Sequence, residues 1–357
     1  MTTAARRAAL RALLRADDLD GLLVTDLVNV RYLTGFTGSN GALLLSAADD
    51  AHSRFGTDGR YVTQAAAEVA DLEPVVERAT ALALAARAAD LGIRRLGFES
   101  DAVTVDAHAA LRKAAGVELV RAPGLVARLR VIKDSGEIEI LRRACAVADT
   151  ALRELLDQGG VRAGRTEREI ALDLDFRMRA LGADGPSFDS IVAAGAHSAI
   201  PHHQPTDTPL RPGDLLKLDF GALVAGYHSD MTRTLVLGSA AQWQRELHAL
   251  AHRAQAAGCA AVGPGVPTAD VDAAARDVIV AAGLGENFVH GLGHGVGLEI
   301  HEAPALGATA TDVLAAGMAV TVEPGVYLPG RGGVRIEDTL VVDGDTLTGF
   351  PKDLLEV

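Results

Sequence analysis

Short apolar runs alternate with amphipathic stretches in the first third of the chain. The runs at residues 21–25, 41–45 and 94–98 have the length and composition of buried strands, and a further strand-like run covers 117–122. Between and after them, apolar residues recur at helical spacing in 62–69, 82–91 and 106–115. This alternation predicts an α/β unit in which some of the strands pair in parallel.

The pair Pro123-Gly124 follows the last of these strands and is typical of a domain boundary. We therefore expect an N-terminal α/β domain over residues 1–124 and a second domain over 125–357. From about Asp134 onward, apolar residues recur every three or four positions, which predicts a long helix that starts there.

A second helix is predicted over residues 166–181, because Thr166 followed by Glu169 has the spacing of a capping box. After Leu210 the chain becomes rich in strand-like segments, with two more helices near 242–262 and 268–282. The second domain is thus expected to be α+β.

Acidic residues occur at regular positions in the strand-like segments of this second domain. In residues 216–220, polar and apolar residues alternate, so Asp219 lies on the face opposite the apolar set. If the following segment forms a hairpin centred between Val224 and Ala225, Asp219 lies directly opposite Asp230. Two like charges with Cβ atoms about 5 Å apart destabilise a sheet, so this register favours a cation between them. A shifted register, with one aspartate only capping a turn, is the open alternative.

Two later strands repeat the pattern. In MAVTVEPGVY the alternation places Glu323 on the polar face, and in GVRIEDTLVV it places Glu337 there rather than Asp338. His294 lies in GLGHGVGLEIHEAP, where each glycine disfavours a helix by about 1 kcal/mol relative to alanine. Burying this many carboxylates without a compensating charge is prohibitive. Two divalent cations would compensate them, and paired metals are a known hydrolytic device.

Four carboxylates and one imidazole would make an oxygen-rich metal site. Such a donor set suits Mn²⁺ better than metals that select thiolates. Zn²⁺ and Co²⁺ stay open, because the general order of metal affinity favours them over Mn²⁺.

Several motifs resemble the proline-directed branch of the pita-bread metallopeptidases, which contains Xaa-Pro aminopeptidase and Xaa-Pro dipeptidase (prolidase). The matching segments are SAIPHH (198–203), LDFGALVAGYHSDMTRT (218–234), HGLGHGVGLEIHE (290–302), TVEPGVY (321–327) and VRIEDT (334–339). YLTGFTGSNG (32–41) and TDGRY (57–61) resemble the N-terminal domain of the shorter bacterial members. The resemblance covers essentially the whole chain. It implies a creatinase-like α/β domain followed by an α+β pita-bread catalytic domain.

The resemblance also implies a set of metal ligands. It implies one cation held by Asp219, Asp230 and Glu337, and a second held by Asp230, His294, Glu323 and Glu337, with a water between the two. Glu323 is a candidate shuttle for the proton that the departing proline nitrogen needs. Arg335 matches an arginine beside the site, and we expect it to hold Glu337 through charge-assisted hydrogen bonds.

Three histidines match family positions around the substrate. The resemblance implies that His202 and His290 shape the proline site and that His301 lies near the scissile carbonyl. His202 is preferred over His203 because it directly follows the matching proline.

The expected activity is hydrolysis of the peptide bond before proline. The N-terminal segments favour an Xaa-Pro aminopeptidase, and an Xaa-Pro dipeptidase stays open as the alternative. A non-catalytic peptide-binding protein on the same scaffold is a remote alternative, since such relatives typically lose ligand acids. A zincin would need HExxH, and the sequence after His301 and Glu302 does not provide it.

Composition adds limits to this interpretation. The 357 residues exceed the length at which one core usually stops growing, which favours two domains. The excess of 47 acidic over 34 basic residues gives a net charge of −13, which disfavours nucleic acids and anionic membranes as partners. Arginines interrupt the N-terminal apolar residues, so neither a signal peptide nor a membrane span is predicted. We expect a cytoplasmic homodimer that acts on proline-containing peptides.

Overall fold

The computed structural model describes residues 1–357 and divides into two compact units, Met1–Arg130 and Val131–Val357. The first unit extends past the boundary expected at Gly124, because helix α6 (Leu125–Arg130) packs on α1 (Thr3–Ala16) and α2 (Leu27–Thr34). Each unit is described by itself below.

The first unit is built on one six-stranded sheet with the order β4-β3-β2-β1-β5-β6. Its strands are β1 (Gly21–Val24), β2 (Gly41–Ser46), β3 (Arg54–Thr57), β4 (Glu73–Val76), β5 (Arg95–Phe98) and β6 (Glu118–Arg121). Strand β2 is antiparallel to both of its neighbours, whereas the other pairs are parallel. The four strands predicted from apolar runs are confirmed. Strands β3 and β4, which have short and partly polar sequences, were not predicted.

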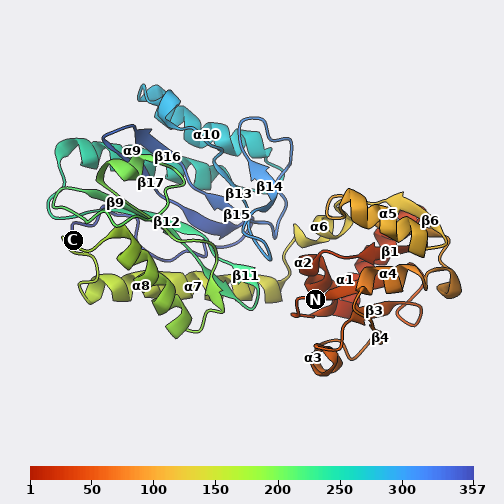
Figure 1. Ribbon diagram of the computed structural model, residues 1–357. Coiled ribbons are helices and arrows are strands. Elements are labelled where there is room, and N and C mark those ends of the chain that lie inside the picture. The colour runs from red at the N-terminus through yellow and green to blue at the C-terminus, as the bar shows by residue number, and fades with distance from the viewer. The chain divides into compact units, whose positions relative to one another are not determined.

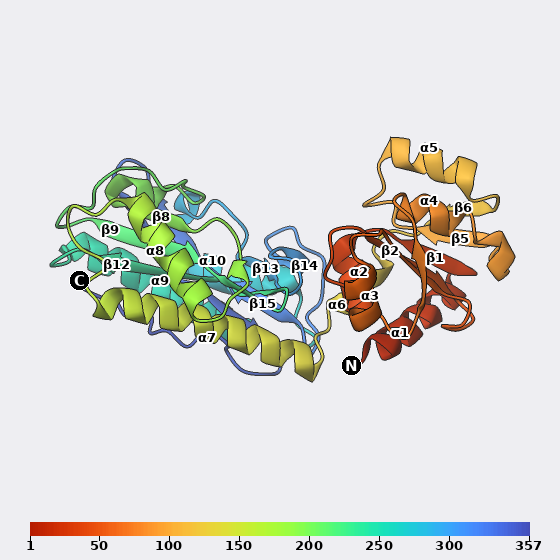
Figure 2. The same ribbon diagram turned by 60° about the horizontal axis from the view of Figure 1, so that its bottom comes forward.

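Helices cover both faces of this sheet. The remaining helices are α3 (Val62–Glu68), α4 (Thr80–Ala85), the 3-10 turn η1 (Ala89–Leu91) and α5 (Val105–Ala114). Helices α4 and α5 pack over one face, where Leu23, Leu44, Leu84 and Leu96 share a core. Helices α1 and α2 lie on the other side of the sheet (Figure 2). The predicted α/β architecture is therefore confirmed for this unit.

The second unit contains four long helices. They are α7 (Ser135–Asp157), α8 (Glu167–Ala180), α9 (Gln242–Ala261) and α10 (Thr268–Ala281). Asp134 caps α7 and Thr166 caps α8, each in a reciprocal capping box. The helices therefore begin where the sequence predicts, because the caps satisfy backbone N–H groups that the first turn leaves unpaired.

The strands of the second unit form several small antiparallel sheets. They are β7 (Gly185–Pro186), β8 (Ile191–Ala194), β9 (Leu215–Phe220), β10 (Ala222–Val224), β11 (Tyr227–His228), β12 (Met231–Val236), β13 (Gly293–Gly295), β14 (Glu302–Leu306), β15 (Ala319–Val322), β16 (Gly325–Leu328), β17 (Gly332–Arg335) and β18 (Asp338–Val341). Two 3-10 turns, η2 (Gly195–Ala199) and η3 (Gly285–Asn287), complete the unit.

These strands lie between the two helix pairs, with α7 and α8 on one side and α9 and α10 on the other (Figure 1). One core joins α7 and α8 to β8, β9 and β12 through residues such as Leu152, Leu174 and Leu218. The other joins α9 and α10 to β15 and β17 through residues such as Ala254 and Val320. This layered α+β arrangement is the architecture implied by the resemblance to the pita-bread metallopeptidases.

The register of the central hairpin differs from the expected one. Strands β9 and β12 pair so that Asp219 lies opposite Thr232, and not opposite Asp230. The prediction of directly opposed aspartates is therefore wrong. Because the shift is two residues, Asp230 still projects from the same face as Asp219.

The cause of the shift lies in the turn of this hairpin. Val224 pairs with Tyr227, so the two turn residues are Ala225 and Gly226. Both have left-handed backbone angles, with φ of 48° and 81°, as in a type I′ turn. The turn centre is thus one residue later than expected, which moves every cross-strand partner by two.

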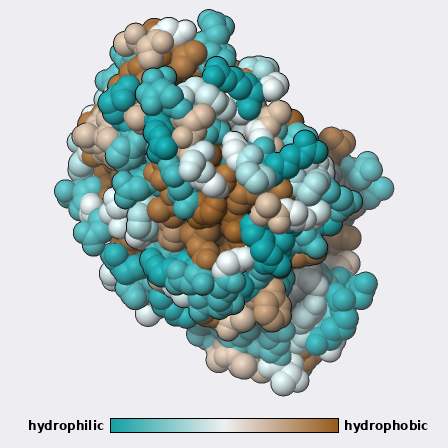
Figure 3. Space-filling model, turned by 90° about the vertical axis from the view of Figure 1, so that its left-hand side faces the viewer, coloured by the Kyte–Doolittle hydropathy of each residue, from teal (hydrophilic) through white to brown (hydrophobic).

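Apolar side chains gather in a patch bordered by hydrophilic ones on the face shown in Figure 3. Exposed large apolar residues of the second unit include Leu172 and Phe176, four positions apart on α8. Across the whole chain, no helix combines the length and apolar character needed to cross a membrane.

We predict that Ala225→Asn stabilises the hairpin. Alanine at positive φ carries a steric cost of about 1 kcal/mol that asparagine partly avoids. Since Ala225 is exposed, the larger side chain has room. Thermal denaturation should show a midpoint raised by about 2–4 °C. The matched variant Gly226→Ala should lower the midpoint, and a lower midpoint for Ala225→Asn would contradict the turn assignment.

Candidate metal centre

The second unit contains a pocket of about 230 Å³ with acidic walls. Its lining includes all five residues predicted as metal ligands: Asp219, Asp230, His294, Glu323 and Glu337. They come from five strands or strand ends of the sheet system, at β9, the start of β12, β13 and the ends of β15 and β17. The structure therefore brings the whole predicted set to one place.

His294 is the centre of the acidic group. Its Nε2 atom lies 3.5 Å from Asp230 Oδ2 and 3.4 Å from Glu323 Oε1. Ligand atoms of Asp230, His294 and Glu337 all lie within 4.8 Å of one another, a spacing that can hold a metal ion. Donor atoms bound to one divalent ion at about 2.0–2.2 Å each have comparable separations.

Alternation along the last strands separates two neighbouring acids, as predicted. Glu337 lines the pocket and accepts a hydrogen bond from Thr232 Oγ1 at 2.7 Å. Asp338 points away, accepts a hydrogen bond from Arg233 Nη2 at 2.8 Å and forms an ion pair with Lys352 Nζ at 2.5 Å. The two carboxylates thus have different environments although they are adjacent in sequence.

The glycines around His294 serve close packing of strands. A Cβ atom at Gly293 would lie 2.1 Å from the carbonyl oxygen of Thr321, and one at Gly295 would lie 2.2 Å from that of Ala303. Strand β13 therefore fits between β14 and β15 only because these positions lack a side chain. The expectation that this stretch is not helical is confirmed.

Arg335 does not hold the acid that the sequence suggested. Its guanidinium forms a close ion pair with Asp219 through Nη2, and Nε donates to Thr232 Oγ1 at 3.0 Å. Thr232, and not Arg335, donates to Glu337. The expected Arg335–Glu337 contact is therefore wrong, because the guanidinium extends across the strands toward β9.

The substrate-side histidines occupy different positions around the site. His202 and His301 line the pocket, and the ring of His301 lies edge-on to that of His294 with centroids 4.4 Å apart. His290 lies outside the lining and its Nε2 is 2.9 Å from the hydroxyl of Tyr327. Tyr327 in turn accepts from Arg335 Nη1 at 2.7 Å.

Sequence reasoning did not single out several residues of this region. Tyr327 lies at the end of a recognised motif, TVEPGVY, so its position in that motif was the available signal. Asp189, Ile191 and Gln204 also line the pocket and belong to no motif recognised in the sequence. Ile300 lines it from within the recognised segment 290–302, and Phe188 lies on the pocket wall, where an aromatic residue of this kind is expected either in the core or on the wall of a cleft.

Burial and repulsion between neighbouring carboxylates favour the neutral forms of Asp230, Glu323 and Glu337. Burial raises the pKa of Asp230, Glu323 and Glu337, and the neighbouring carboxylates raise it further. For His294, burial alone would lower the pKa, but Asp230 and Glu323 beside the ring raise it to about 9. The pocket therefore favours any added positive charge.

Two carboxylate oxygens provide a direct test of whether cations fit. Asp219 Oδ1 and Glu337 Oε1 are buried and have no hydrogen-bond partner in the protein. Such unpaired buried oxygens are costly. Since both belong to the pocket lining, divalent cations bound there would satisfy them, and the donor set fits the metal pair inferred from the sequence.

Comparison with known proteins agrees with this geometry. The profile described as Metallopeptidase family M24 matches residues 139–344, and the profile described as Creatinase/Prolidase N-terminal domain matches residues 6–132. The chain belongs to metallopeptidase family M24. Membership in M24 identifies it as a metallopeptidase and implies that it works with divalent metal ions.

Individual M24 relatives resemble the chain along its whole length. The structure of an Xaa-Pro dipeptidase from Bacillus anthracis superposes with a TM-score of 0.95 at 40% identity, covering 100% of both chains. An X-Pro aminopeptidase from Thermotoga maritima gives 0.89 at 34% identity, covering 96% of this chain and 99% of that one. An Xaa-Pro dipeptidase of Pyrococcus horikoshii is 35% identical over 91% of each sequence.

We predict that divalent metal stabilises this M24 protein more at pH 8 than at pH 5.5. The folded pocket has raised carboxylate pKa values, so without metal it binds more protons than the unfolded chain. Its stability should then fall as pH rises through those values, and protons should compete with metal at low pH. A hundredfold excess of Mn²⁺ over its Kd adds about 2.7 kcal/mol.

Thermal shift of chelator-treated protein, with and without Mn²⁺ at both pH values, measures this effect. The variant Glu337→Gln removes one buried charge and should lose most of the gain at pH 8. An equal gain at both pH values would contradict binding at the carboxylates.

Proposed function

We propose that this chain is an Xaa-Pro dipeptidase that uses two divalent cations, with Mn²⁺ favoured. The observation that supports the metal site most strongly is that five residues of metal-ligand type line one pocket. Two of their buried carboxylate oxygens have no hydrogen-bond partner in the protein. The N-terminal motifs favour an aminopeptidase, but the named dipeptidases among the relatives support the dipeptidase better. The Thermotoga maritima aminopeptidase keeps the other activity open as a second candidate.

In this proposal Asp219, Asp230 and Glu337 would hold one ion, and Asp230, His294, Glu323 and Glu337 would hold the other. When bound, divalent cations supply an activated water and a polarised carbonyl. Arg335 orients Asp219 through their ion pair, and Thr232 orients Glu337. Each contact orients its carboxylate and leaves the second oxygen, Asp219 Oδ1 or Glu337 Oε1, without a partner in the protein.

The side chains around the ions have roles of their own. His301, on the pocket wall, donates a hydrogen bond to the developing oxyanion. Glu323 Oε holds the proton that the proline nitrogen takes up as it leaves. His202 lines the pocket and would contact the proline ring there, and His290, which lies outside the lining, would act through its contact with Tyr327. The peptide bond before proline has no N–H group. The pocket wall at His202 therefore needs no hydrogen-bond acceptor for an amide hydrogen of the substrate.

We predict a substrate preference that separates the candidate activities. The purified enzyme should hydrolyse Xaa-Pro dipeptides with kcat/KM at least about tenfold above Xaa-Ala dipeptides and Xaa-Pro-Yaa tripeptides. Coupled detection of released proline or product chromatography measures both ratios. Preferential cleavage of the tripeptides would support the aminopeptidase instead, and equal rates for Xaa-Ala would contradict proline specificity.

We predict that Asp230→Ala loses both ions, since the proposed ligand set places that carboxylate on each of them. Elemental analysis should show less metal than in the wild type at equal protein concentration, and kcat should fall by more than about 100-fold. The control is Asp338→Asn, which alters the neighbouring acid that points away from the pocket and should keep the metal. Two tightly bound ions in Asp230→Ala would refute the ligand assignment.

A further inference from the structure

His202 lies on a segment of the pocket wall, residues 200–206, that belongs to no helix or strand. The segment connects the short turn η2 to the loop that leads into β9. A side chain carried on such a segment keeps its position only if contacts from elsewhere hold the backbone. Two separate groups of buried side chains provide those contacts.

The first group holds the backbone immediately before His202. Lys217, from β9, is completely buried, and its Nζ donates to the carbonyl oxygens of Ile200 at 2.6 Å and Pro201 at 3.0 Å. Arg335 Nη1 also donates to the Pro201 carbonyl at 3.2 Å. Two basic side chains from the strand layer thus fix the peptide group that precedes His202.

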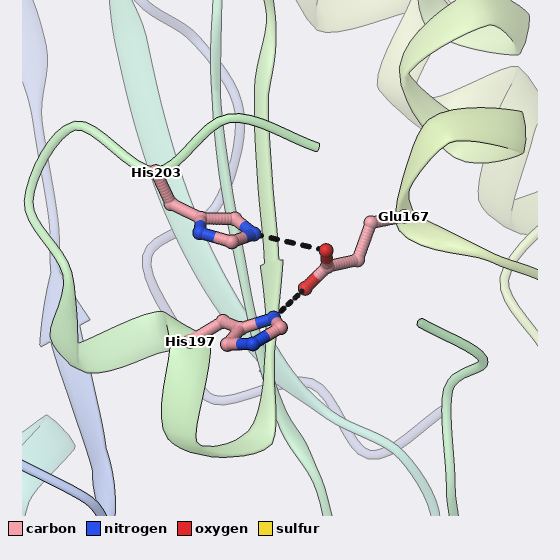
Figure 4. A group of neighbouring side chains, drawn as sticks. All are labelled: Glu167, His197 and His203. Carbon is pink, nitrogen blue, oxygen red and sulfur yellow. Dashed lines mark hydrogen bonds and ion pairs between the residues drawn. The ribbon is translucent and has the colours of Figure 1, made fainter. Parts of the chain in front are cut away.

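The second group holds the backbone immediately after His202. Glu167, at the start of α8, is completely buried and accepts hydrogen bonds from His203 Nε2 at 2.9 Å and from Thr206 N and Oγ1 at 2.9 and 2.7 Å. The same carboxylate accepts from Ala194 N at 2.8 Å and from His197 Nδ1 at 2.9 Å. Figure 4 shows both imidazole rings directed at the carboxylate from the same side.

Glu167, His197 and His203 also have the composition of a metal site, with ligand atoms within 4.8 Å of one another. However, the carboxylate oxygens already accept five N–H and O–H donors at normal distances. Burial alone would raise the pKa of Glu167, but the hydrogen bonds from Ala194, Thr206 and His203 lower it to about 2. Hydrogen bonds to an ionised acceptor therefore account for this group without an ion.

We propose that Lys217 and Glu167 are positioning residues, which hold the segment 200–206 from its two sides and thereby set the place of His202 in the pocket. Neither residue lines the pocket, so each acts through the segment and not on the substrate. The inference rests on the proposed function, in which His202 shapes the proline site.

A double-mutant cycle tests the first anchor. Lys217→Met keeps an unbranched side chain of similar length but has no donor, and His202→Ala removes the ring. Each single variant should raise KM about tenfold with kcat changed less than about threefold. The double variant should match His202→Ala, because the lysine acts through that ring. Effects on KM that multiply would overturn the inference, as would loss of metal from Lys217→Met.

A pair of variants at His203 tests the second anchor, and does so even if Lys217→Met fails to fold. His203→Gln places an amide donor near the position of Nε2 and should keep KM within about twofold of the wild type. His203→Ala removes the donor and should raise KM several-fold, with no further rise in combination with His202→Ala. Equal damage from both substitutions would overturn the inference. So would a metal equivalent present in the wild type and missing from His203→Ala.

All of these assays use whichever dipeptide the wild-type enzyme hydrolyses fastest. If that dipeptide lacks proline, the proposed specificity fails, while the cycle still tests whether Lys217 and His203 act through His202. If it is an Xaa-Pro dipeptide and the effects multiply, the positioning role fails and the proposed function stands.

Discussion

Mutual repulsion of buried carboxylates is the constraint on which the catalytic unit depends. Asp219, Asp230, Glu323 and Glu337 meet in one pocket, and the protein itself supplies only His294 and Arg335 as close positive partners. Such a cluster stays folded with its acids ionised only if further positive charge enters. The strands on both sides of the pocket, and the glycines that let β13 approach its neighbours, serve to bring these donors together.

Much of this arrangement could be predicted because a strand has a fixed period of two. Alternation separated Glu337 from Asp338 correctly, and it placed Asp219 and Asp230 on one face although their pairing was misjudged. The error in the pairing register arises at the turn, where Ala225 adopts a left-handed backbone conformation that is unusual for alanine and is not predicted from the sequence. Moving a hairpin centre by one residue changes every cross-strand partner by two positions. Each side chain therefore stays on the face of the sheet that the sequence predicts for it.

Contacts between residues far apart in the chain could not be predicted in the same way. Arg335 is two residues from Glu337, yet its guanidinium reaches Asp219, 116 positions away. Alternation along β9 places Lys217 on the same face as Asp219, but it does not indicate that the lysine is buried against two carbonyl oxygens. Glu167 is one of two acids in the first turn of α8, and its sequence position does not indicate that it accepts hydrogen bonds from β8, η2 and the segment 200–206. The hydrogen-bond partners of these side chains depend on how the helices and strands pack together in the folded protein.

The length of the two-residue turn at Ala225 and Gly226 decides which face of β12 carries Asp230. If one residue were inserted or deleted there and the pairing of β12 shifted with it, every later position of β12 would turn to the opposite face. Asp230 would then face the core that Met231 and Leu235 now fill. Exposed loops usually accumulate such insertions and deletions without harm. In this hairpin, evolution can exchange side chains at the turn, but a register shift of one residue would remove Asp230 from the active site.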